Sequence, residues 1–280
     1  MLRPGEPIIH DGNAHLFDAD QQVNGERKAR GLVPRDYTRH PVGSVSGSMA
    51  YAVDMPTIPR SEWSARIKEM VETKSRLSDM RLVGNGGQPI PSLDQNGQGY
   101  CWAYSTTMAV MMLRMIMNLP YVRLSAHATA CVIKNFRDEG GWCGLSMERQ
   151  VSHGTPSVEF WTEKSMSRSH DKPETWANAA LHKVTEGWVD VHAAVYDRNL
   201  TFDQVMTCLL CRVPVAADFN HWSHSVCLLD PVEVEPGSFG VRLINSWTDS
   251  WGDRGMAVMQ GGKAIPDGAV APRAVNPSLT

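Results

Sequence analysis

The chain has 280 residues, with 27 Lys and Arg against 30 Asp and Glu and a formal net charge of −3. Its 42% of hydrophobic residues is enough for one sizeable buried core. No excess of basic residues favours binding to nucleic acid, and no run of charge favours an anionic membrane surface. We therefore expect a partner that is neither a nucleic acid nor a membrane.

Residues 1–56 are rich in Gly, Pro, Asp, Asn and Arg and show little hydrophobic periodicity. This predicts an irregular N-terminal arm rather than a second core. The arm lacks the apolar stretch of a secretory signal, and the most apolar segment, residues 106–122, is too short for a membrane span and contains Arg114. We expect a protein of a reducing compartment, cytoplasmic or carried within a larger particle, and not one secreted through a recognisable signal peptide.

Helical patterns begin after the arm. Pro59 and the apolar spacing that follows it predict a helix over 61–77. A connector rich in Gly, Pro and Asn at 83–99 leads to a second helix, which begins near Cys101. Because that helix is apolar nearly all round, we expect it to be buried. Further helices are predicted at 125–136, 146–152 and 173–184.

The last third of the sequence changes to short apolar runs separated by turn residues. These runs predict strands at 213–219, 225–229, 240–245 and 255–259. Helices first and strands later predict an α+β fold with a helical N-terminal half around a central helix, a β-rich C-terminal half, and a cleft between them. The expected divisions are the arm at 1–56, the main domain at 57–265 and a C-terminal tail at 266–280.

The six cysteines do not show the pattern of a disulfide framework. Cys208 and Cys211 form a C-x-x-C pair, but no second pair follows, so buried helical thiols are favoured over structural zinc. Cys101 differs because it follows a loop with two glycines at a helix start. Backbone N–H groups there stabilise a thiolate and can hold a developing oxyanion. Gln95, six residues upstream, could add a side-chain amide to that oxyanion hole.

The surroundings of Cys101 resemble the signature of the papain family of cysteine peptidases. In that family a Gln precedes the nucleophile by six residues and the central helix opens with C-W-A-F-S; here Gln95 is followed by C-W-A-Y-S from Cys101. The family motif N-S-W-G-x-x-W-G-x-x-G is matched from Asn245 by N-S-W-T-D-S-W-G-D-R-G, with Thr248 in place of the first glycine. The resemblance covers about residues 90–260 and implies a papain-like, two-lobed fold.

The resemblance also implies the roles of the site residues. Cys101 would be the nucleophile, His224, which precedes an apolar run, would be its base, and Asn245 would orient the imidazole. Trp247 would cover the hydrogen bond between that imidazole and Asn245. Trp251 would form a wall on the leaving-group side of the cleft.

Substrate contacts are implied at three further positions. Gly140 and Gly141 lie where the family places a glycine-rich strip that pairs with the substrate backbone, although a plain loop explains them equally well. Trp222 would lie near a rebuilt S2 pocket, since few residues separate the preceding strand from His224. His221 is a competing base that lacks the following apolar run. His221 and His224 lack an obvious third ligand for a metal, and we expect no metal and no cofactor.

The function that follows is thiol-dependent hydrolysis of a peptide or protein substrate through an acyl-enzyme thioester. The alternative is a papain-like domain that acts mainly as a structural or docking component of a larger assembly, such as a virus particle, contacted through residues 1–56. Acyl transfer is a third hypothesis, but those families generally use Asp as the third site residue. Gln98 replaces a cysteine that secreted relatives bond, which favours the non-secreted, disulfide-free members. Residues 1–56 also lack the pattern of the family's inhibitory prosegment.

Overall fold

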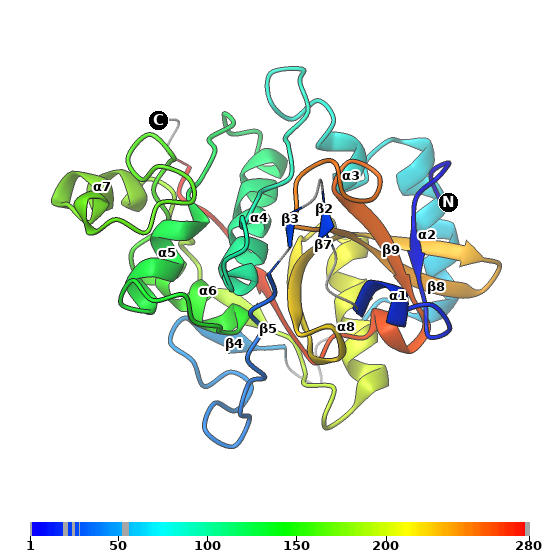
Figure 1. Ribbon diagram of the computed structural model, residues 1–280. Helices are drawn as coiled ribbons and strands as arrows, with labels where there is room; N and C mark the ends of the chain where they lie inside the picture. The colour runs from blue at the N-terminus through cyan, green and yellow to red at the C-terminus, as the bar shows by residue number, and fades with distance from the viewer. Residues whose placement is uncertain (1, 19–21, 24–25, 28, 52–55, 278–280) are drawn as a thin grey trace.

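The computed structural model describes residues 2–18, 22–23, 26–27, 29–51 and 56–277. Its core consists of two hydrophobic clusters. One cluster surrounds helices α4 to α6, and the other lies between the sheet and helices α2 and α8. In Figure 1 the helices α4 to α7 gather on one side and the strands β8 and β9 with helix α2 on the other. This is the predicted α+β arrangement of a helical half and a β-rich half.

The helices are α1 (His15–Asp18), α2 (Arg60–Glu72), α3 (Leu77–Met80), α4 (Cys101–Ile116), α5 (Ala126–Ile133), α6 (Cys143–Ser152), α7 (Pro173–Ala180) and α8 (Arg198–Leu210). The strands are β1 (Ile8–Ile9), β2 (Gln22–Val23), β3 (Glu26–Arg27), β4 (Ser48–Ala50), β5 (Trp188–Asp190), β6 (Val215–Phe219), β7 (His224–Glu235), β8 (Ser238–Ile244), β9 (Met256–Gln260) and β10 (Gly268–Pro272). Each helix and strand predicted between residues 59 and 259 has a counterpart, although the helix predicted over 61–77 ends at Glu72 and α3, α8 and β5 were not foreseen.

The central helix α4 is surrounded by the rest of the protein. Every residue from Cys101 to Arg114 is buried, as the apolar sequence of this helix requires. The helix packs against β6 and β7 on one side and against α5 and α6 on the other. Within the described residues the main sheet has the strand order β1-β9-β8-β7-β6-β10-β5-β4. The first turn of α4 and the start of β7 therefore lie at the boundary between the two halves.

The C-terminal segment differs from the predicted tail at 266–280. Strand β10 lies inside the sheet, antiparallel to β6 on one side and to β5 on the other. All five of its residues are buried. Its Gly, Ala and Pro residues give no alternating pattern, so nothing local marked it as a strand. Residues 278–280 lie outside the described residues.

The N-terminal arm is built into the fold at both of its ends. Strand β1 pairs in parallel with β9, and β4 pairs in parallel with β5 at the opposite edge of the sheet. The described parts of the arm thus lie on both sides of the molecule, β1 beside β9 and β4 below α6 (Figure 1). The expectation that residues 1–56 contact a larger assembly stays a prediction; the contacts described here are with the chain's own two halves.

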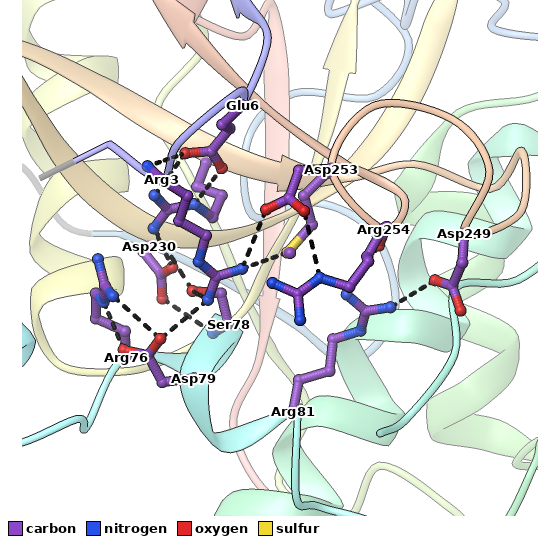
Figure 2. A network of polar contacts seen from close by, with 12 residues as sticks. Arg3, Glu6, Arg76, Ser78, Asp79, Arg81, Asp230, Asp249, Asp253 and Arg254 are labelled. Atoms are coloured by element: carbon purple, nitrogen blue, oxygen red, sulfur yellow. Dashed lines mark hydrogen bonds and ion pairs between the residues drawn. The ribbon is translucent and has the colours of Figure 1, made fainter. Parts of the chain in front are cut away.

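A buried ion network holds the first residues of the arm (Figure 2). The Arg242 guanidinium binds both carboxylate oxygens of Glu6, with N–O distances of 2.5 and 2.8 Å, and one oxygen of Asp230 at 2.8 Å. All three side chains are fully buried. Arg3 adds an ion pair to Asp79 at 2.9 Å and a hydrogen bond to Ser78. The N-terminal residues are thus part of the folded body.

Two other features bear on the sequence predictions. Cys208 is a buried helical thiol as expected, whereas Cys211 follows the end of α8 and is exposed. In the part of the chain that the structure describes, no helix has the length and apolar character needed to cross a membrane.

Candidate active site

Cys101 is the first residue of α4 and is fully buried. The loop before it is hydrogen-bonded to the segment after β8. The Gln95 N–H donates to the Ser246 carbonyl at 3.0 Å, and Asp94 and Trp247 form an isolated antiparallel β-bridge. As the first helical residue, Cys101 has no carbonyl one turn back to receive its own N–H. The helix start therefore presents a thiol and a backbone donor at one place.

His224 and Asn245 are brought together by strand pairing. His224 opens β7, Asn245 follows the last residue of β8, and the two strands are antiparallel neighbours. His224 Nε2 lies 2.8 Å from Asn245 Oδ1. That oxygen also accepts the Ser246 N–H, so it is the acceptor and the ring donates. Among the described residues, His224 Nδ1 has no hydrogen-bond partner.

Aromatic rings enclose the imidazole. The Trp247 ring stacks on His224 with centroids 4.6 Å apart, and the Trp222 ring meets it edge-on at 5.0 Å. Trp251 packs against both tryptophans and is nearly buried. The Trp222 indole N–H donates to the Phe17 carbonyl of the arm. In this arrangement Trp222 and Trp251 belong to a closed aromatic cluster.

The side-chain amide of Gln95 is held in a fixed orientation. Its Oε1 accepts the Ser246 hydroxyl at 2.5 Å, so Nε2 must point away from the Asn245 segment. Nε2 donates to the Gln98 carbonyl and to the Ala29 carbonyl, both at 2.8 Å. The Ala29 carbonyl of the arm therefore accepts a hydrogen bond from Gln95 Nε2, the group that the sequence analysis expects to bind an oxyanion.

Residues 29–33 of the arm lie over Cys101 in an extended conformation. The Gly31 carbonyl accepts the Gly141 N–H at 2.9 Å, and the Val33 N–H donates back to the Gly141 carbonyl at 2.9 Å. Leu32 donates its N–H to the Ser223 carbonyl at 3.2 Å. The arm is therefore hydrogen-bonded to both halves of the protein where the sequence predicts a cleft.

The Cys101 thiol and the His224 imidazole are both neutral in this covered state. Burial raises the pKa of the Cys101 thiol to about 12. Burial also lowers the pKa of His224 to about 3, against a smaller opposing effect of its hydrogen bond to Asn245. The Gly31 amide and Ser225 lie near the sulfur. Because burial disfavours both charged forms, a thiolate–imidazolium pair can form only after the arm moves and water reaches the two side chains.

The glycines at 140 and 141 are explained by close approach. A Cβ on Gly140 would lie 2.5 Å from the Gly31 carbonyl oxygen, and one on Gly141 would lie 2.7 Å from the Trp102 ring. Gly141 pairs here with the arm, so the substrate-binding roles of Gly140 and Gly141 stay predictions. Thr248, which replaces the family's first glycine, has φ +67°, a conformation that favours glycine.

No protein-family model matches the sequence, and no curated protein matches it. Solved structures of papain-like cysteine proteases do match. Xylellain, a cysteine protease from Xylella fastidiosa, aligns with a TM-score of 0.61 and 14% identity over 91% of this chain and 98% of that chain. Procathepsin L2 proteinase from Tenebrio molitor larval midgut aligns with a TM-score of 0.57 and 18% identity over 88% and 78%. The proform of the ragweed pollen allergen Amb a 11, a cysteine protease, gives 0.52 and 16% over 66% and 63%.

The chain has the papain-like fold. In this papain-like fold the sequence-predicted residues Gln95, His224, Asn245 and Trp247 form one connected set. Cys101 lies near this set, since Ser225, the neighbour of His224 in β7, is close to it.

Sequence reasoning missed three residues of the site. Ser225 donates its hydroxyl to Asp218, and Ser225, Asp218 and Gly31 of the arm all lie near Cys101. A signal was present for Asp218, because it is the single charged residue in the otherwise apolar strand β6. No local pattern marked Gly31, since its contacts are with residues about 70 to 190 positions away.

Three buried histidines predict a loss of stability in acid. Burial lowers the pKa of His224 to about 3 and those of His127 and His182 to about 4, from an ordinary value of 6.5. The unfolded chain takes up these protons below pH 6.5 while the folded chain resists them, so their stabilisation is complete above pH 6.5 and is lost as the pH falls towards 4 and 3. At pH 5 each costs on the order of 1–2 kcal/mol.

Urea unfolding at pH 7.5 and pH 5 measures this loss. In His182→Gln the difference between the two free energies of unfolding should shrink by on the order of 1–2 kcal/mol, because one buried group no longer titrates. An unchanged difference would contradict the assignment of this pH dependence to the buried histidines.

Proposed function

We propose that this chain is a papain-like cysteine peptidase that hydrolyses peptide bonds with Cys101 as its nucleophile. The observation that carries the proposal is that the site binds an extended peptide backbone, its own arm. One carbonyl of that peptide lies at the Gln95 amide, and its backbone is bonded to Gly141 and Ser223 on either side. A site that holds a peptide in this way beside a thiol and an oriented imidazole is suited to attack on peptide carbonyls.

The proposed reaction uses the two ends of the His224 ring separately. With Nε2–H bonded to Asn245, Nδ1 is the basic nitrogen and takes the proton of Cys101. The thiolate attacks the substrate carbonyl carbon, and the resulting oxyanion is held by Gln95 Nε2 and the Cys101 N–H. The imidazolium then protonates the leaving amine as the C–N bond breaks, which leaves a thioester on Cys101.

Water completes the cycle. His224 Nδ1 removes a proton from a water molecule, and the hydroxide attacks the thioester carbonyl. Collapse of this second tetrahedral intermediate breaks the C–S bond, releases the carboxylic acid and returns the proton to the thiol. Trp247 shields the His224–Asn245 hydrogen bond from water during these steps.

The arm covers the site without presenting a bond for cleavage. The group of the arm that lies near the Cys101 sulfur is the Gly31 N–H. The pairing with Gly141 is parallel, so its two hydrogen bonds go to residues on either side of Leu32. We infer that the arm blocks substrate in the state described here.

Labelling with an epoxysuccinyl inhibitor of cysteine peptidases tests the proposal. The reduced full-length protein should gain one adduct by intact mass, and Cys101→Ala should gain none. Cys211→Ala, which removes the exposed thiol, should label like the wild type. If Cys101 stays unlabelled even when substitutions in the arm uncover it, the peptidase proposal is wrong.

A further inference from the structure

Arg114 lies in the last turn of α4 and is buried there with almost no partner. The residue is 2% exposed, and among the described residues its Nε and Nη1 atoms have no hydrogen-bond acceptor. Its Nη2 lies 3.5 Å from the Pro120 carbonyl, at the limit of a hydrogen bond. Within the same part of the chain, no carboxylate forms an ion pair with this guanidinium. An arginine side chain stays protonated in proteins, so Arg114 is a buried cation without a counter-charge.

The other arginines buried to the same degree are paired. Arg81 is 1% exposed and its Nη2 lies 2.6 Å from Asp249. Arg242 is fully buried and binds the carboxylates of Glu6 and Asp230. The fold thus gives these two guanidinium groups the negative partners that a buried charge requires, and Arg114 differs from both.

The end of helix α4 does not replace such a partner. A helix C-terminus carries a partial negative charge, equivalent to about half an elementary charge, which favours a cation in the last turn. However, the carbonyls of residues 113–115 accept the backbone N–H groups of residues 117–119, and among the described residues none of them is bonded to the guanidinium. The charge is therefore compensated only in part, and two of its donor atoms stay unused.

A small cavity lies against this side chain. Arg114 and Pro120 both line it, and the rest of its wall comes from Gly84, Ile90, two methionines of α4 and the segment around Tyr121. Within the described residues, Arg114 is the single charged residue of that wall. The cavity has about 10 Å³ of space for the centre of a water-sized particle, which is room for one atom.

The size and charge of the cavity select its occupant. A water molecule fits and can accept hydrogen bonds from the guanidinium, but it leaves the positive charge uncompensated. A carboxylate, phosphate or sulfate group carries the right charge but has several heavy atoms, which exceeds the space. A monatomic anion satisfies both requirements.

We propose that Arg114 binds one monatomic anion, chloride in ordinary buffers, in the cavity between α4 and the segment that follows it. The anion supplies the counter-charge that Arg81 and Arg242 receive from carboxylates. Arg114 follows Cys101 by 13 residues in α4, which places the site roughly 20 Å along the helix from the candidate active site. The inference therefore goes beyond the proposed function and does not depend on it. Anion binding stabilises the helix that begins with Cys101.

Thermal unfolding of the full chain in mixtures of sodium chloride and sodium gluconate, at constant total salt concentration, tests this site. Gluconate is too large for the cavity, and the constant concentration keeps the screening of surface charges equal. A tenfold excess of chloride over its dissociation constant should raise Tm by about 2–4 °C. Arg114→Met, which keeps the length of the side chain without its charge, should have the same Tm in both salts.

Arg123→Met is the matched control. Arg123 lies close to the cavity in sequence but is paired with Glu163 at 2.6 Å, so its removal should leave the chloride dependence of Tm as in the wild type. Crystals of the wild-type protein grown in sodium bromide give a second measurement that needs no variant to fold, and an anomalous bromide peak is expected beside the Arg114 guanidinium. Equal Tm values of the wild type in the two salts, a chloride dependence that persists in Arg114→Met, or a cavity that holds only water in bromide would each overturn the inference.

Discussion

Replacing Gly31 by valine is expected to uncover Cys101 and to speed its labelling roughly 100-fold. A Cβ at position 31 would lie 2.0 Å from the Gly99 carbonyl oxygen, far inside van der Waals contact. Gly99 cannot yield easily, because its N–H donates to Asp138 and its carbonyl accepts the Trp102 indole N–H. The arm must therefore move away from the start of α4.

The size of the effect follows from the contacts that hold the arm in place. Three backbone hydrogen bonds to Gly141 and Ser223 would be lost, each worth about 1 kcal/mol. Since every 1.4 kcal/mol changes an equilibrium tenfold, the uncovered state should become roughly 100 times more populated. The rate of adduct formation with an epoxysuccinyl inhibitor measures this population directly.

A control on the same arm separates release from general disturbance. Val33→Ala changes an exposed side chain but keeps the backbone N–H that bonds Gly141, so its labelling rate should stay within a few-fold of the wild type. Equal rates for Gly31→Val and the wild type would mean that the arm does not limit access to Cys101.

Removing the charge of Glu6 is expected to destabilise the fold by about 3 kcal/mol. Arg242, Glu6 and Asp230 are all fully buried, and within the described part of the chain Glu6 supplies two of the three hydrogen bonds from the guanidinium to carboxylate oxygens. Glu6→Gln keeps the shape of the side chain but removes one of the two carboxylates that the described residues place against the buried arginine. Loss of the Glu6 charge lowers the free energy of unfolding because the buried Arg242 guanidinium cannot replace that partner with water.

Urea unfolding followed by tryptophan fluorescence measures this loss. Glu62→Gln is a matched control, since Glu62 pairs with Arg66 on the exposed face of α2 and such pairs contribute about 0.5 kcal/mol or less. If Glu6→Gln and Glu62→Gln changed stability equally, the N-terminal residues would not be part of the cooperative fold. The expected result instead makes residues 3–9, which include strand β1, part of the cooperative fold.

The elements that the sequence predicted share a local signal. Helix α4 is apolar nearly all round, and β6 to β9 are apolar runs between turn residues. Each of these elements can therefore be recognised from its own residues, without knowing which element packs against it. Helix α8 lacks such a pattern because it buries polar side chains, among them Thr201 and Gln204. Strand β10 was read as a tail because only its neighbours β5 and β6 make it a strand.

The same distinction separates the parts of the candidate site. Cys101, His224 and Asn245 stand in motifs with their own spacing, and strand pairing brings His224 and Asn245 together. The role of Gly31 depends on a contact with Gly99 across the fold, which no spacing encodes. Ser225 and Asp218 became visible only when the register of β6 and β7 was known.

The position of β10 has a consequence for the order in which the protein is made. Residues 268–272 are synthesised after all the other strands of the main sheet, yet β10 must insert between β6 and β5. Until then β6, which carries Asp218, has no partner on one side, and β5 and β4 are not joined to the rest. A nascent chain that carries all of the site residues therefore still lacks the completed sheet, so assembly of the site is delayed until translation has passed this late strand.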